Sequence, residues 1–248
     1  MQTQSVVARD EWLEARKALL EREKAHSRAG DELAAARRAL PWVAVETGYV
    51  FQTEQGERTL GQLFDGRSQL IVYHFMFGPG WTEGCTGCSF LADHFDGANL
   101  HLANHDVTLL AVSRAPLAEF LPFKRRMGWR FPWVSAGSDF NYDFDASFRP
   151  EDVAAGRTTY NYRPYRGDME DLHGLSVFVQ DGDGRIFHTY SSYGRGGDVL
   201  IGAHHFLDLT PKGRDEASTM DWVRLHDRYE DAPAPMAVAP EASCCAAE

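Results

Sequence analysis

A strand-like apolar run that leads into a pair of cysteines is the feature that most constrains the fold of this chain. Residues 70–77 read LIVYHFMF, which predicts a strand buried on both faces. A glycine-rich loop follows, and the pattern then predicts a helix from Cys85 to about Leu102. A buried strand, a loop and a helix in this order predict an α/β protein with its cysteines at the start of a helix.

The rest of the chain continues to alternate between strand and helix patterns. The predicted elements are two short strands within 42–60, a strand at 106–113, a helix at 116–128, a strand at 131–136, a hairpin at 175–193 and a helix at 196–209. Residues 137–172 have no clear period and predict an irregular insertion. Strand–helix alternation implies parallel strands with helices on both faces, and the hairpin adds antiparallel strands, so we expect a mixed sheet.

Residues 1–41 differ in composition and pattern from the rest of the chain. They are rich in strong helix formers and predict a helical arm over 8–40, with a break at Gly30-Asp31. Trp12, Ala15, Leu19, His26, Leu33, Ala36 and Leu40 mark one apolar face. We expect this arm to pack on the main domain at 42–229, and a dimerising or partner-binding helix is the alternative. The Ala/Pro-rich residues 230–248 predict a disordered tail.

Composition and charge exclude several classes of partner. The net charge of −11 disfavours a nucleic-acid partner, because an acidic chain repels phosphate backbones. No apolar run approaches the ~20 residues of a membrane span. The first residues lack the charged and then apolar segments of a signal peptide, so we expect a cytoplasmic protein. A reducing cytosol argues against structural disulfides, which leaves catalysis or metal binding for a C-x-x-C pair.

The position of Cys85 and Cys88 favours redox chemistry. A thiolate at a helix N-terminus is stabilised by free backbone N–H groups and the helix dipole, which lowers the pKa of Cys85. Cys88 lies one turn later, where it can form a disulfide after Cys85 has attacked a substrate. Glu83 opposes the effect with its negative charge, so the sequence alone does not set the pKa. Half of a zinc site and two ordinary buried cysteines are the alternatives.

Three long stretches carry a resemblance to a known family. They are LFDGRSQLIVYHFMFGPGWTEGCTGCSFLADHFDG, VTLLAVSRAPLAEFLPFKRRMGWRFPWVSAGSDFNYDF and HTYSSYGRGGDVLIGAHHFLDLTPKGRDE. The chain closely resembles the bacterial domain-of-unknown-function family 899 (DUF899), predicted dithiol–disulfide oxidoreductases of the thioredoxin-like superfamily. The resemblance implies a thioredoxin-like core of peroxiredoxin-type layout, with Cys85 as the nucleophile and Cys88 as the resolving cysteine.

The expected substrate site includes one departure from that superfamily. Thioredoxin-like folds usually carry a cis-proline just before the first hairpin strand, and His173 and Gly174 stand there instead. We expect substrate to dock beside Trp81, Thr82, His173 and Gly174. The substrate is a thiol or disulfide, which could belong to a protein. No phosphate-binding glycine motif is present, so we expect no organic cofactor.

Two other activities fit the same fold. Pro79, Thr82 and Cys85 resemble the loop of a thiol peroxidase, although that loop is one residue short and its arginine partner could be any of Arg163, Arg166 and Arg195. A copper protein of the Sco type would instead use Cys85, Cys88 and His173, because thiolates and imidazole suit copper. The tail pair Cys244-Cys245 could relay electrons to the C-x-x-C pair by thiol–disulfide exchange.

Overall fold

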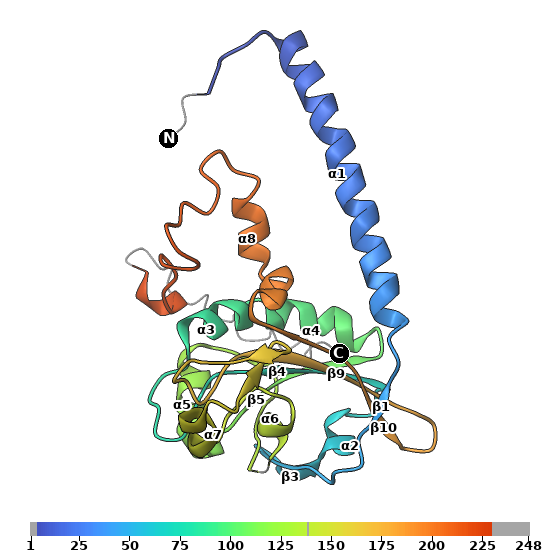
Figure 1. Cartoon of the computed structure of the whole chain (residues 1–248), viewed down its shortest axis with the longest axis vertical. Coiled ribbons are helices and arrows are strands. Elements are labelled where there is room, and N and C mark those ends of the chain that lie inside the picture. The colour runs from blue at the N-terminus through green and yellow to red at the C-terminus, as the bar shows by residue number, and fades with distance from the viewer. Residues whose placement is uncertain (1–3, 138, 230–248) are drawn as a thin grey trace, which may run out of the picture.

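The computed structural model describes residues 4–137 and 139–229, and a mixed sheet with helices on both faces lies at its centre (Figure 1). The strands are β1 (Val43–Ala44), β2 (Val50–Thr53), β3 (Gly56–Thr59), β4 (Gln69–His74), β5 (Val107–Ser113), β6 (Trp133–Ser135), β7 (Thr159–Tyr160), β8 (Arg163–Pro164), β9 (Gly174–Gln180) and β10 (Ile186–Tyr193). The helices are α1 (Arg9–Arg38), α2 (Leu60–Leu63), α3 (Thr86–Ala92), α4 (Phe95–Ala103), α5 (Leu117–Arg126), α6 (Phe140–Asp143), α7 (Pro150–Ala155), η1 (Gly194–Leu200), α8 (Gly202–Leu207) and η2 (His226–Arg228).

The main sheet has the order β1-β10-β9-β4-β5-β6-β2-β3. Strand β4 runs parallel to β5 and antiparallel to β9, and β5 runs parallel to β6. The β9–β10 hairpin is antiparallel and carries a register shift between His188 and Tyr190. The core β6-β5-β4-β9-β10 therefore consists of three parallel strands followed by an antiparallel hairpin. This is the thioredoxin-like mixed sheet that we predicted, and the predicted elements of the core are present.

Side-chain alternation along the central strands divides the core into two clusters, one on each face of the sheet. On the first face Tyr73 and Ala111 pack with the helix residues Phe90, Phe95 and Phe120 of α3, α4 and α5. The other face holds residues of the same strands with residues of α2 and α6; these are Leu70, Val72, Leu110, Leu60, Leu63 and Phe140. The strand that leads to the cysteines is thus buried on both faces, as its apolar run predicted.

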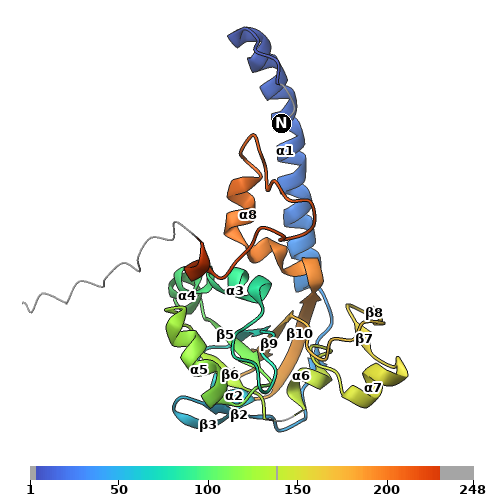
Figure 2. The ribbon, with the colours of Figure 1, turned by 90° about the vertical axis from the view of Figure 1, so that its left-hand side faces the viewer.

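The N-terminal arm differs from our prediction in two respects. α1 is one continuous helix through Gly30, because a single glycine costs only about 1 kcal/mol in a helix of strong formers. The helix also has no buried residue, and it projects away from the sheet (Figure 2). The expectation that the arm packs on the main domain is therefore wrong, and its apolar residues Trp12, Leu19 and Leu33 are exposed.

The helix predicted after the cysteines is divided into α3 and α4. Its last turn is tight, because the His94 N–H donates to the Leu91 carbonyl at 3.1 Å rather than to Phe90. The His94 ring lies 2.9 Å from the free Phe90 carbonyl and takes its place as hydrogen-bond partner. A side chain that competes for a backbone carbonyl is a tertiary detail that periodicity does not reveal.

The remaining departures are local. The insertion at 137–172 contains the short elements α6, α7, β7 and β8, and the helix expected at 196–209 is divided into η1 and α8. Within 4–137 and 139–229, no helix is both long enough and apolar enough to cross a membrane. The tail predicted at 230–248, with Cys244 and Cys245, lies outside the described residues.

Candidate dithiol site

The loop between β4 and α3 presents Cys85 at the N-cap of α3. The Cys85 N–H donates to the Met76 carbonyl at 3.2 Å, and the Ser89 N–H closes the first helical turn on the Cys85 carbonyl at 2.9 Å. Gly84 is required beside the cysteine, since a Cβ there would lie only 2.6 Å from the Phe75 ring and 2.9 Å from the Phe123 ring. The loop is therefore packed against the apolar core.

The two cysteines are free thiols in different surroundings. Cys85 is partly exposed, whereas Cys88 is 1% exposed and belongs to the core cluster of Phe90 and Phe95. Hydrogen bonding from the Cys88 thiol lowers the pKa of Cys85 to about 6. Burial opposes this change, and the backbone N–H groups of Cys88 and Gly87 support it. These N–H groups belong to the first turn of α3, so the lowering of the Cys85 pKa agrees with the effect of a helix N-terminus.

The pKa of Cys88 shifts in the opposite direction. Burial raises the pKa of Cys88 well above its ordinary value, and hydrogen bonding and charge repulsion from Cys85 raise it further. Tyr73 of β4 acts on the same thiol, because hydrogen bonding to Tyr73 lowers the pKa of Cys88 in part. The pKa of Tyr73 is itself raised well above its usual range, chiefly by burial, so the phenol stays protonated and can donate. These surroundings favour the thiolate on Cys85 and the protonated thiol on Cys88.

The acidic residue beside the cysteines is neutralised by two cations. Glu83 forms ion pairs with Arg126 of α5 and with Arg228 of η2. It is not among the groups that shift the pKa of Cys85. Our expectation that Glu83 opposes the thiolate is therefore wrong, because its charge is compensated by partners that lie far away in sequence.

The residues expected to bind substrate lie in two places. Thr82 is exposed, and the half-buried Trp81 ring lies 6.4 Å from the Phe77 ring. The His173 ring faces the Gly194 carbonyl at 3.1 Å. Gly174 begins β9 opposite His74 at the end of β4, so it lies at the same end of the sheet as the cysteine loop.

The alternative activities receive little support from the side chains that they need. Among the described residues no three His, Cys, Asp or Glu side chains form a group that could hold a metal ion, so His173 does not complete a copper site with the cysteines. The arginines proposed for a peroxidase are engaged elsewhere, since Arg166 donates to the Gly156 carbonyl and Arg195 pairs with Asp198. Arg163 lies in the exposed β8 hairpin strand. No arginine is among the groups that lower the pKa of Cys85.

Sequence reasoning missed the C-terminal residues that border the cysteines. A Cβ built on Gly87 would lie 3.9 Å from the Cys85 sulfur and 3.5 Å from the Met220 sulfur, so both sulfur atoms lie near one point. Trp222 packs on Phe90 of α3 with ring centroids 5.5 Å apart. The stretch MDWVRLHDRY predicted only a short helix or strand, and its apolar residues were the one signal of a packed segment.

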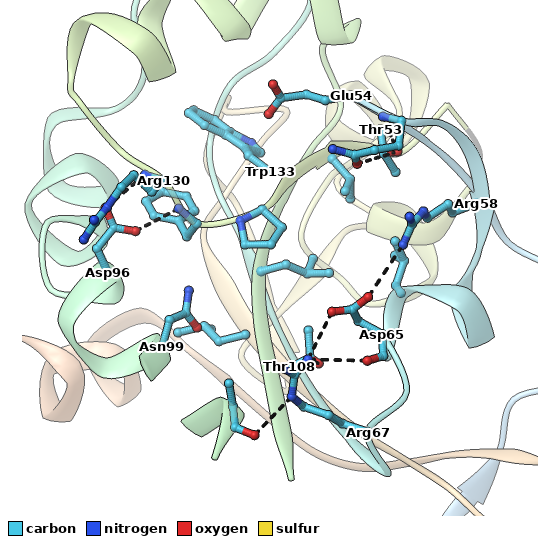
Figure 3. Close-up of a pocket in the computed structure, with 18 of the residues that line it drawn as sticks. Thr53, Glu54, Arg58, Asp65, Arg67, Asp96, Asn99, Thr108, Arg130 and Trp133 are labelled. Atoms are coloured by element: carbon cyan, nitrogen blue, oxygen red, sulfur yellow. Dashed lines mark hydrogen bonds and ion pairs between the residues drawn. The ribbon is translucent and has the colours of Figure 1, made fainter. Parts of the chain in front are cut away.

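A separate cavity of about 760 Å³ lies between α4, β5 and the β2–β3 hairpin (Figure 3). Its apolar floor includes Leu109 and Trp133, and its charged side chains are paired, as in the Lys124–Glu54 contact of 2.6 Å and the Arg67–Asp65 contact of 3.2 Å. Neither cysteine lines it, and none of the residues predicted for the site does so. The candidate chemistry is therefore not in this cavity.

The fold and the site together define the class of the protein. A dithiol at the N-terminus of a helix, directly after a central strand and beside an antiparallel hairpin, is the arrangement of a thioredoxin-like protein. The chain belongs to the family described as "Bacterial protein of unknown function (DUF899)", whose model matches residues 1–229. Among curated proteins none matches this chain.

Solved structures resemble parts of the chain at low identity. Peroxidoxin BcpB from Mycobacterium tuberculosis is 14% identical, with 66% of this chain and 94% of that chain covered and a TM-score of 0.43. A Xanthomonas campestris peroxiredoxin Q structure is 14% identical, with coverage of 66% and 95% and a TM-score of 0.45. A yeast mitochondrial 1-Cys peroxiredoxin is 17% identical, with coverage of 68% and 78% and a TM-score of 0.38. These similarities assign no activity to this chain.

Proposed function

We propose that this protein is a thiol–disulfide oxidoreductase. The observation that carries the proposal is the division of roles within the pair, in which the Cys85 pKa is lowered to about 6 and the Cys88 pKa is raised. A thiolate is the attacking species in thiol–disulfide exchange, so Cys85 is the nucleophile. Cys88, which is buried and protonated, is the resolving cysteine.

The reaction balances with the two cysteines alone. The Cys85 thiolate forms a bond to one substrate sulfur, and the other substrate sulfur leaves as a thiolate. Cys88 then loses its proton and attacks the Cys85 sulfur, which releases the second substrate thiol. Two electrons pass to the substrate and a Cys85–Cys88 disulfide forms. Once Cys85 is in the mixed disulfide it is uncharged, so its repulsion no longer raises the Cys88 pKa.

Cysteine replacements test the two roles separately. Each variant carries Cys244→Ser and Cys245→Ser, so that only the C-x-x-C pair reacts, and dithiothreitol supplies the electrons. We expect Cys85→Ser to abolish reduction of 2-hydroxyethyl disulfide. In a separate reaction without dithiothreitol, which would reduce the product, Cys88→Ser should accumulate a mixed disulfide on Cys85, which intact-mass spectrometry detects. Unchanged turnover in Cys85→Ser would refute the proposal.

The same cysteine variants test whether the protein is a peroxidase. The observation that favours peroxide as a substrate is the loop with Pro79 and Thr82 ahead of Cys85. We expect hydrogen peroxide to be turned over more slowly than the disulfide, because two of the candidate arginines, Arg166 and Arg195, are held by other groups. Faster turnover of peroxide, lost in Cys85→Ser, would replace the proposed activity with a thiol peroxidase.

A further inference from the structure

The last part of the described chain, residues 216–229, crosses the dithiol site, and we call this segment the strap. Its red end lies close to α3 and α4 in both views of the molecule (Figures 1 and 2). Val223 and Leu225 are 4% and 3% exposed and belong to the same apolar cluster as Cys88 and Phe90. The strap is therefore part of the core beside the cysteines.

Charged contacts fasten the strap to both ends of the cysteine region. Arg126 of α5 bridges Asp227 of the strap, at 2.7 Å, and Glu83 of the cysteine loop. Arg228 of the strap pairs with the same Glu83. At the other end of α3 the His226 ring lies 2.7 Å from the Asp93 carboxylate. The strap is thus held on the loop before Cys85 and at the end of the helix after it.

The strap places Met220 beside the nucleophile. The position at which a Gly87 side chain would begin lies within 4 Å of both the Met220 and Cys85 sulfur atoms. Met220 has a φ of 62°, a left-handed conformation that a non-glycine residue adopts only when its surroundings impose it. The Glu216 carboxylate accepts the Met220 N–H at 2.9 Å, and the Val223 N–H donates to the Met220 carbonyl at 3.1 Å. The tight turn therefore fixes the backbone from which the Met220 side chain extends.

We propose that Met220 forms one wall of the substrate site and restricts the dithiol to low-molecular-weight disulfides. The inference rests on the proposed function and names its substrate class. The attacked sulfur must approach Cys85 in line with its own S–S bond, and a folded protein brings main chain on several sides of that bond. The strap occupies one of these sides. A small disulfide needs no such space, and the flexible thioether of Met220 can pack against it.

Alkylation measures access to Cys85 without requiring turnover. The test compares the alkylation rate of N-ethylmaleimide with that of a maleimide that carries a bulky polyethylene glycol chain, in protein with Cys244→Ser and Cys245→Ser. In the parent protein the small reagent should react much faster. Met220→Ala should reduce the ratio of the two rates by about tenfold, the effect of removing an access barrier of ~1.4 kcal/mol. Met220→Leu, which retains bulk, should restore the ratio.

Turnover measures the same selectivity on substrates. We expect Met220→Ala to raise kcat/KM for insulin relative to 2-hydroxyethyl disulfide, by a factor similar to the change in alkylation. Leu209→Ala is the matched control, because Leu209 is a large aliphatic residue in the same C-terminal region and is 84% exposed. Thermal melts of all variants establish that they fold.

The outcomes separate the two proposals. An unchanged ratio of alkylation rates in folded Met220→Ala overturns the role of the strap, whatever the enzyme activity. A lowered ratio supports that role, and a raised ratio overturns it. If neither disulfide is turned over faster than by Cys85→Ser, the oxidoreductase activity fails while the effect of Met220 on access stands.

Discussion

The pKa of Cys85 should depend on its neighbour Cys88. Hydrogen bonding from the Cys88 thiol is the largest cause of its shift from 9.0 to about 6. At 1.36 kcal/mol per unit, this shift corresponds to about 4 kcal/mol between the thiolate and thiol forms. About nine-tenths of Cys85 is then thiolate at pH 7. Cys88→Ala removes the donor, and a return of the pKa to ~8 would leave about one-tenth as thiolate.

The assay is the pH dependence of Cys85 alkylation by iodoacetamide. We expect the parent rate to reach half of its maximum near pH 6, since the thiolate is the reacting form. In Cys88→Ala the midpoint should rise by at least about two units and the rate at pH 7 should fall about tenfold. Cys88→Ser keeps an O–H donor and should lie between them. Equal midpoints in Cys88→Ala and the parent would refute the assignment of the Cys88 thiol as the main support of the thiolate.

Two further predictions concern the core and the arm. Burial lowers the pKa of His74 to about 4 from 6.5, so the unfolded chain takes up a proton first as the pH falls, and stability should decline between pH 6.5 and 4. Urea unfolding across this range should show a flatter decline in His74→Gln, and an identical decline would contradict it. On α1, Trp12, Leu19, His26 and Leu33 recur at every seventh residue, so we expect these helices to pair in a homodimer. Sedimentation velocity should find a dimer that Leu33→Asp dissociates, and a monomeric parent would contradict the pairing.

The core of the fold could be predicted because its signals are local. The run at 70–77 is apolar on both faces of a strand and predicted a buried strand. The structure confirms this prediction, because β4 is buried between two clusters. The Asp-Gly-Asp-Gly turn likewise predicted the β9–β10 hairpin. Each of these inferences depends on the residue types within one element and not on distant contacts.

The failures occurred where a distant partner decides the outcome. Glu83 is neutralised by Arg126 and by Arg228, and the second of these lies 145 positions away in the chain. The exposed face of α1 has the composition of a packed helix, yet periodicity cannot tell which surface covers it. Within the described residues no part of the domain buries it.

In the candidate site, too, local features could be predicted from the sequence and distant contacts could not. The C-x-x-C spacing after a buried strand was sufficient, by itself, to determine that two thiols meet at the start of a helix, because one helical turn brings residues three apart together. The start of a helix already favoured a lowered pKa for Cys85, and tertiary structure added the raised pKa of Cys88 and its hydrogen bonding to Cys85, since both arise from packing. It also decided what borders them. Met220 lies near Cys85 in a distant segment that the Glu83–Arg126–Asp227 ion pairs hold against the cysteine loop.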